Sequence, residues 1–352
     1  MADAPLKSRT PERKLSHLRA SLEGDVSFPR LTTGLERYRF LHQALPELDW
    51  ADVDPRCTLL GHPLCAPLLI SSMTGGAEAS GGISPREINL RLAQAAQEFG
   101  LALGVGSQRA ALEHPELAYT YQVRHVASDI LLLANLGAVQ LNYGYGVAEC
   151  QRAVEMIGAD GLILHLNPLQ EYFQPQGNLN FAGLLGKIEG ICQALDVPVI
   201  VKEVGWGICP SVAQKLIQAG VAAIDVAGAG GTSWVEVEGQ LTSDPVKRQV
   251  AVTFADWGIP TAEALVAVRE ALPQIPLIAS GGLRSGLDVA QAVALGADVA
   301  GIAGPLLTAA HDSSARLRGL IERILQELKL AMFATGSAIL TDLRRPDLLI
   351  LE

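Results

Sequence analysis

The sequence predicts a (β/α)8 barrel, and two observations carry this prediction. Eight short apolar runs recur along the 352 residues, and each ends in small or polar residues. Segments with helical period separate them, so that successive runs begin 23 to 53 residues apart. Continuous apolar runs of this length are typical of parallel strands buried on both faces. Eight strand–helix units of this size indicate a closed barrel. A doubly wound sheet is the alternative, although it rarely has eight units this regular.

Each strand and helix can be assigned in order. The expected strands are residues 67–73, 102–108, 130–136, 161–167, 198–204, 223–228, 276–282 and 299–305. The first helix is expected over 85–100, where Ile88, Leu92 and Phe99 share one stripe and Pro85 suits a helix start. Further helices are expected at 147–158, 181–195, 210–220, 261–272 and 285–296, several of which end at Gly.

Two segments fall outside this repeat. Residues 1–66 form a leader with a basic stretch, and the interval between strands six and seven holds residues 234–260, expected as a long loop over the barrel mouth. A long helix over 313–336 is expected to pack on the outside of the barrel. With no low-complexity linker, we expect one domain, in which the leader contributes to the site and residues 67–352 form the barrel.

Composition narrows the function classes. Hydrophobic residues make up 49% and charged residues 18%, which excludes disorder as the main state. A net charge of −10 argues against general nucleic-acid binding. No apolar run is long enough for a membrane span. The start has no secretory pattern, and five cysteines without CxxC spacing favour reduced thiols. We therefore expect a cytoplasmic protein.

Glycine-rich turns follow the last three expected strands. They contain Gly230–Thr232, Gly281–Gly282 and Gly304, where main-chain N–H groups can approach an anion at a helix start. In a barrel of this class, the turns after strands seven and eight often bind phosphate. A single glycine pair could serve only a tight turn, but three consecutive turns favour a bound phosphate.

Lys202 stands inside an apolar strand, which needs a reason because a buried lysine is rare unless paired. It could contact a flavin ring, form a Schiff base, or pair with Glu203. We favour the flavin, since Asn135 and Ser72–Thr74 offer amide and hydroxyl partners to a neutral heterocycle.

Polar residues also gather after strand four, where His165, Asn167, Gln170 and Glu171 follow one another. They could bind a polar substrate and a divalent cation. One carboxylate suffices for Mg²⁺ when substrate phosphates and water supply the other ligands. His165 alone could equally be a hydrogen-bonded barrel histidine.

The leader carries Lys7, Arg9, Arg13, Lys14, His17 and Arg19. These charges could belong to a solvated tail or to a clamp that folds over the mouth and grips an anion. Arg109, after strand two, would face the same anion from within the barrel.

The ordered motifs RKxxH, SSMTGG, GSQR, ANLGAVQ, HLNPLQE, VKEVGWG, GAGGTSW, SGGLR and AGP resemble those of type 2 isopentenyl-diphosphate Δ-isomerase. The resemblance runs from about residue 10 to the end of the chain. SGGLR is common to many flavin barrels, whereas HLNPLQE, GSQR and the basic leader together are specific.

This resemblance implies FMN, Mg²⁺ and NADPH or NADH as cofactors, a diphosphate substrate, and a homotetramer or homo-octamer. It implies FMN contacts at Ser72, Met73, Thr74, Ser107, Asn135, Lys202, Thr232, Gly281, Gly282, Arg284, Ala303 and Gly304. It implies substrate contacts at Arg13, Lys14, Ser107, Gln108, Arg109 and Gln170. Glu171 would hold Mg²⁺, and Gln170, His165 and Asn167 are the expected catalytic residues.

Two other classes stay open. An FMN-dependent barrel oxidoreductase would need either a His and Arg pair or a nucleophilic Cys near the later strands, and GAGGTSW has none of these. A non-enzymatic phosphate-binding barrel would be colourless.

Overall fold

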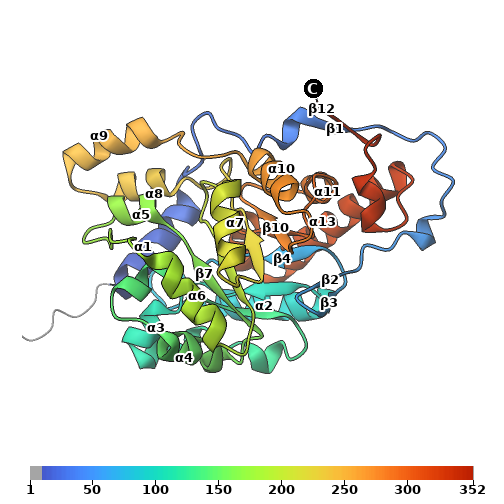
Figure 1. Cartoon of the computed structure of the whole chain (residues 1–352). Helices are drawn as coiled ribbons and strands as arrows, with labels where there is room; N and C mark the ends of the chain where they lie inside the picture. Colours follow the sequence, from blue (N-terminus) through green and yellow to red (C-terminus); the bar gives the residue numbers. More distant parts are fainter. Residues whose placement is uncertain (1–9, 352) are drawn as a thin grey trace, which may run out of the picture.

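Eight parallel strands close into a barrel in the computed structural model, which describes residues 10–351 (Figure 1). The strands are β4 (Leu68–Ile70), β5 (Ala102–Gly104), β6 (Leu132–Gly137), β7 (Gly161–His165), β8 (Val199–Lys202), β9 (Ala223–Asp225), β10 (Leu277–Ser280) and β11 (Val299–Ile302). Each pairs with the next along the chain, and β11 pairs with β4 to complete the ring. The predicted fold class is therefore confirmed.

Most strands end earlier than the sequence pattern suggests. The run expected over 102–108 is a strand only at Ala102–Gly104, and the run expected over 276–282 only at Leu277–Ser280. The small and polar residues beyond these points form the loops at the carboxyl ends of the strands. This is the end that carries the active site in barrels of this class.

Helices cover the outside of the ring. They are α2 (Pro85–Phe99), α4 (Val147–Ile157), α6 (Leu184–Ala194), α7 (Pro210–Gln218), α10 (Thr261–Ala271), α11 (Gly286–Ala294), α12 (Gly304–Asp312) and α13 (Ser314–Ala334). The first of them begins at Pro85, as predicted; the Ser84 hydroxyl accepts from the main-chain N of Glu87, and Gly100 ends the helix in the left-handed conformation. The long α13 packs on α11 and α12, as expected.

A hairpin covers the amino ends of the strands. It consists of β2 (Cys57–Leu59) and β3 (His62–Leu64), and its buried Leu59 and Leu64 pack with the inward-facing residues of the barrel, including Leu133 and Ile200. The larger apolar core lies between the strands and the outer helices. With the lower end filled by apolar side chains, polar groups can gather only at the opposite end.

The interval between β9 and β10 is more regular than expected. Instead of one long loop over 234–260, it contains α8 (Trp234–Leu241) and α9 (Pro245–Phe254). Both begin with a side-chain cap, from Ser233 for α8 and from Asp244 for α9. The segment projects from one end of the molecule (Figure 1).

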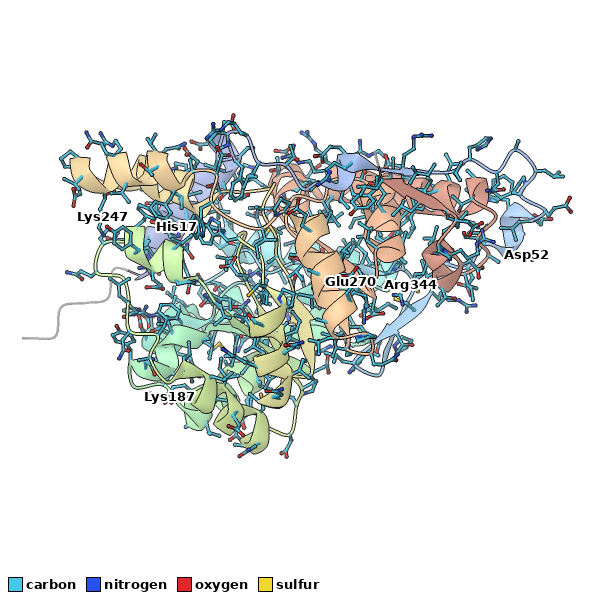
Figure 2. All side chains as sticks on the ribbon, turned by 45° about the horizontal axis from the view of Figure 1, so that its top comes forward. His17, Asp52, Lys187, Lys247, Glu270 and Arg344 are labelled. Carbon is cyan, nitrogen blue, oxygen red and sulfur yellow. The ribbon has the colours of Figure 1, made fainter. Side chains whose placement is uncertain are left out.

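The leader is integrated with the barrel at two places. Helix α1 (Thr10–Glu23) contacts α8, α12 and the short α3 (Arg109–Glu113), while β1 (Tyr38–Phe40) pairs with β12 (Leu349–Leu351) near the other end of the chain. Lys7 and Arg9 lie outside the described residues. Figure 2 shows His17 of α1 at the same end of the molecule as Lys247 of α9, with Asp52 at the opposite end.

The remaining elements are short. They are α5 (Pro168–Phe173), η1 (Leu35–Arg37), η2 (Trp50–Asp52), η3 (Pro115–Thr120), η4 (Arg124–Val126), η5 (Ala138–Asn142) and η6 (Leu340–Arg344). Across residues 10–351, none of the helices combines the length and the apolar character that crossing a membrane would require.

Candidate active site

A cavity of about 530 Å³ lies at the carboxyl ends of the strands. The loop or last residues of each of the eight strands contribute to its lining, together with α1 and the start of α8. Every residue for which the family resemblance implies a role lines this cavity, except Gln108. The carboxyl ends of the strands bring most of these residues together, and helix α1 adds Arg13 and Lys14.

Gln108 does not reach the cavity. Its side chain is fully buried, and its Nε2 donates to the main-chain oxygen of Ala153 at 2.8 Å while its Oε1 accepts from the main-chain N of Asn135 at 3.0 Å. The amide here ties the β5 loop to β6 and α4 and is not part of the cavity lining, so a substrate contact by Gln108 stays a prediction.

Three glycine-containing turns meet on one side of the mouth: Gly228–Thr232, Gly281–Gly282 and Ala303–Gly304, called the glycine turns below. Gly281 has a φ of 104°, and a Cβ at this position would overlap the carbonyl group of Gly228. By contrast, a Cβ on Gly304 would meet nothing within 4 Å, although the residue lines the cavity and begins α12. Open space thus lies beside the start of α12, where a helix N-terminus can bind an anion.

The neighbouring β4 loop offers polar groups with no partner. Among the described residues, the buried hydroxyls of Ser71 and Ser72 have no hydrogen-bond partner, and both line the cavity. A buried hydroxyl is normally satisfied. These two, with the space beside Gly304, match what a phosphate-bearing heterocycle such as FMN would fill.

Lys202 extends from the end of β8. Its Nζ donates to the main-chain oxygen of Glu203 at 2.5 Å, so the contact with Glu203 is not a carboxylate pair. The Glu203 carboxylate instead accepts main-chain N–H groups from the loop 204–206, and burial raises the pKa of this carboxyl to about 7. The register places Lys202 beside Asp225 of β9. The pKa of Asp225 is raised, because the effect of burial outweighs the lowering effect of the Lys202 charge.

His165 ends β7 as a neutral side chain. Its Nδ1 lies 2.8 Å from Oδ1 of Asn135 on the adjacent strand. Burial, and then the charges of Lys202 and Lys14, lower the pKa of His165 to about 3. The imidazole can therefore form hydrogen bonds near neutral pH but contributes no positive charge for an anion.

Asn167, Gln170 and Glu171 form a linked group at the start of α5. The Asn167 Nδ2 donates to Gln170 Oε1 at 3.0 Å and to Glu171 Oε1 at 3.2 Å. The second carboxylate oxygen of Glu171 accepts from the main-chain N of Asn178 at 2.6 Å. The buried Oδ1 of Asn167 has no partner among the described residues. A carboxylate beside a free amide oxygen is a donor set that suits Mg²⁺.

The sequence analysis missed Glu238, on α8. Its Oε1 accepts from Gln170 Nε2 at 3.3 Å and from Gln174 Nε2 at 3.0 Å, and it lies 3.0 Å from Nε2 of His17. The side chain is 2% exposed. One signal was available: a carboxylate in the apolar run WVEVEGQL needs a partner if that run is buried. Because residues 234–260 were expected to form an exposed loop, Glu238 was not considered a buried carboxylate.

Arg13, Lys14 and Arg109, called the basic cluster below, meet across α1 and the start of α3. Arg109 Nε donates to Glu113 at 2.6 Å, while Lys14 Nζ donates to the main-chain oxygen of Ser107 at 2.5 Å. Burial, and then the charges of Arg13 and Arg109, lower the pKa of Lys14 to about 7. Three cations this close favour an anion among them.

Comparison with known proteins agrees with this geometry. A family model described as FMN-dependent dehydrogenase matches residues 168–349. Among solved structures, a mandelate oxidase is similar over 97% of this chain and 95% of its own, with a TM-score of 0.66 and 20% identity. A lactate oxidase of Pediococcus acidilactici is similar over 100% and 96%, with a TM-score of 0.66 and 17% identity. At such low identity these two structures show the shared fold alone.

Sequence relatives are far more similar. A protein of Nostoc sp. named isopentenyl-diphosphate delta-isomerase is 56% identical over 96% of this chain and 95% of its own. Proteins with the same name from Synechococcus sp. and Stutzerimonas stutzeri are 56% and 51% identical, again over nearly the full length of both chains. Since a flavin-barrel family model and these full-length relatives agree, this chain belongs to the isopentenyl-diphosphate delta-isomerase family, in its FMN-dependent form.

Proposed function

We propose that this protein interconverts isopentenyl diphosphate and dimethylallyl diphosphate, with reduced FMN bound in the barrel mouth, as a step of isoprenoid biosynthesis. One observation carries the proposal beyond family membership. A single cavity is lined by the glycine turns, by polar residues at the strand ends and by the basic cluster. Two anionic groups, a cofactor phosphate and a substrate diphosphate, would account for the glycine turns and the basic cluster.

The reaction is balanced without net redox change. A proton adds to the terminal methylene carbon of isopentenyl diphosphate, and another leaves the carbon on the far side of the double bond, so that the bond moves by one position. Positive charge develops between these two carbons. Bound reduced FMN would supply an electron-rich ring and an exchangeable proton.

This chain's residues would hold FMN by main chain and side chain together. The glycine turns, with Thr232 and Arg284, would take the phosphate. Lys202, Asn135, Ser107 and the stretch Ser72–Thr74 would take the polar edge of the ring. The unpartnered hydroxyls of Ser71 and Ser72 support this fit.

The basic cluster would bind the diphosphate, and a linked group of neutral residues would orient the reacting carbons. Asn167 donates to one end of the Gln170 amide, and the other end donates to Glu238. Held at both ends, Gln170 would present a fixed surface to the substrate. His165 would donate or accept a hydrogen bond as a neutral ring, because its pKa lies at about 3.

Glu171 would be the protein ligand of Mg²⁺. Within the described residues no cluster of three or more His, Cys, Asp or Glu could hold a metal. A cation here would therefore take most of its ligands from the diphosphate and water, with Glu171 and the free Oδ1 of Asn167 beside it.

The other expectations belong to the same proposal. Reduced nicotinamide, NADPH or NADH, would prime the flavin, since the isomerisation itself consumes no electrons. The protein would work in the cytoplasm as a homotetramer or homo-octamer, with the leader of residues 1–66 completing one domain. Size-exclusion chromatography with light scattering would measure the assembly.

The decisive experiment uses prereduced holoenzyme in heavy water without oxygen. Isopentenyl diphosphate should become dimethylallyl diphosphate with deuterium incorporated, over many turnovers after a single reduction of the flavin. Mass spectrometry measures the label, and absorbance measures NADPH.

Consumption of one NADPH per product would overturn the proposal and favour the FMN-dependent oxidoreductase instead. Product without deuterium would argue for an intramolecular hydrogen shift. Oxygen must be excluded because reoxidation of the flavin consumes NADPH by itself. Enzyme without reductant serves as the matched control.

A further inference from the structure

Lys14 is held by two acceptors that do not belong to any ligand. Its Nζ donates to the main-chain oxygen of Ser107 at 2.5 Å and to the hydroxyl of Tyr121 at 2.9 Å. The Tyr121 hydroxyl in turn donates to the same Ser107 oxygen at 2.5 Å. The leader helix is thus joined to the barrel at one triangle of polar atoms.

Tyr121 is in a position to act as a fixed partner. Its side chain is fully buried, and burial raises its pKa well above 10, so the hydroxyl keeps its proton. The β4 loop lies directly on the ring: a Cβ on Gly75 or Gly76 would overlap Tyr121 atoms. The preceding residue, Thr120, accepts from the main-chain N of Gly76 at 2.9 Å through its Oγ1. The ring therefore cannot move without the loop that carries Ser72–Thr74.

The geometry leaves one bond for a ligand. An ammonium group has three N–H donors. Two of them are directed at Ser107 and Tyr121, and Lys14 also lines the cavity. The third donor is therefore available to an anion in the mouth.

The charges around Lys14 explain why such a partner is needed. Arg13 and Arg109 both disfavour its positive charge, and Glu113 favours it less strongly than burial opposes it. Without fixed acceptors, the ammonium would gain by withdrawing from the two guanidinium groups toward water. The Tyr121 hydroxyl and the Ser107 oxygen oppose that movement.

We propose that the Tyr121 hydroxyl is a positioning group that holds the Lys14 ammonium, and with it helix α1, at the mouth before any diphosphate binds. It does not touch the substrate; it acts through Lys14. This inference rests on the proposed function for the identity of the substrate, but it also applies to any diphosphate bound at the basic cluster.

The test is Tyr121→Phe in the full-length holoenzyme, which removes the hydroxyl and keeps the ring. We expect KM for isopentenyl diphosphate to rise about five- to tenfold, as for the loss of one hydrogen bond to a charged group, with kcat within about twofold. The dissociation constant for inorganic pyrophosphate, measured by calorimetry, should rise by the same factor. The matched control is Tyr119→Phe, at an exposed tyrosine of η3, the short helix that ends just before Tyr121.

A double-substitution cycle separates positioning from general loosening. In the Lys14→Met background, Tyr121→Phe should change KM by less than about 1.5-fold, because the partner through which it acts is gone. Equal effects in both backgrounds would overturn the proposal. So would a Tyr121→Phe protein that loses its flavin or melts early, since the hydroxyl would then serve the fold.

The pyrophosphate arm keeps this result distinct from the proposed function. If wild-type enzyme binds pyrophosphate but does not isomerise isopentenyl diphosphate, the proposed function fails while the calorimetric comparison still decides the role of Tyr121. If wild-type enzyme isomerises its substrate and Tyr121→Phe matches it in both measurements, only the positioning role fails.

Discussion

The two sides of the cavity differ in what they are made of. On one side, the glycine turns after β9, β10 and β11 offer main-chain N–H groups, and α12 begins there. On the other side, the polar groups are side chains of α1, α3 and α5, and Glu238 of α8 supports them by accepting from Gln170. The first side is formed by three short motifs of consecutive residues. The second depends on four helices that are distant in the sequence.

This difference has chemical consequences. A main-chain site has no side chain that titrates near neutral pH, and at Gly281 its geometry depends on a turn in which a Cβ would overlap the Gly228 carbonyl. A side-chain site depends on burial and on neighbouring charges, which shift pKa values. Ligand binding at the glycine turns should therefore be most sensitive to substitutions that add bulk. Binding on the opposite side should be most sensitive to substitutions or pH changes that alter charge.

The largest effect is expected from Gly281→Ala. The new Cβ would overlap the Gly228 carbonyl at a φ of 104°, so the turn would have to move. We expect the ratio of bound flavin to protein, measured by absorbance, to fall at least about tenfold, since the flavin phosphate would lose several aligned N–H donors. Gly319→Ala is the control, because a Cβ on this glycine of α13 meets nothing within 4 Å. Full flavin content in Gly281→Ala would mean that this turn does not hold the cofactor.

An intermediate effect is expected from Glu171→Gln. The amide would bring an N–H₂ group or a neutral oxygen where the carboxylate now accepts from Asn178 and Asn167. The Mg²⁺ concentration that gives half-maximal activity should rise about tenfold or more, because a hard cation prefers the charged oxygen. Bound flavin should be unchanged, since Glu171 lies on the opposite side of the cavity from the glycine turns. Glu189→Gln, on the exposed face of α6, is the control, and an unaltered Mg²⁺ response in Glu171→Gln would remove this residue from the cation site.

The smallest effect is a pH dependence confined to the basic cluster. The pKa of Lys14 lies at about 7 without ligand, so the ammonium that favours an anion is present below pH 7 and lost above it. The affinity advantage of wild type over Lys14→Met for inorganic pyrophosphate should shrink about tenfold between pH 6 and pH 8. Calorimetry measures it, and the variant corrects for the ionisation of pyrophosphate itself.

The charged groups that act on Lys14, or respond to its charge, are Arg13, Arg109, Glu113 and His165. The Lys14→Met variant keeps all of them, so the comparison corrects for their own titration. The pKa of Tyr121 lies well above 10 and that of His165 at about 3. The remaining neighbour is the Glu113 carboxylate, which pairs with Arg109. Parallel pH curves for wild type and Lys14→Met would show that Lys14 does not supply the charge.

Local sequence patterns are enough to predict the barrel and the glycine-rich side of the cavity. Apolar runs such as ILLLANL and PLIASGG predict strands because burial on both faces selects continuous apolar sequence. The change from apolar to glycine-rich or polar residues at the end of each run then marks the mouth. These signals are local, because each depends on a few consecutive residues. The closed topology then brings the eight carboxyl ends together at one rim of the barrel.

The contacts of the site side chains depend instead on how distant segments pack against one another. Gln108 follows a strand as closely as Ser107 does, yet its amide is directed away from the cavity and toward Ala153, because buried main-chain groups of neighbouring segments need partners. Glu238 and Tyr121 lie on segments with no site motif and reach the mouth through contacts with α5 and α1. Hydrogen bonds and charge pairs between distant segments depend on distances of a few ångströms, and one sequence does not encode such distances in any local pattern.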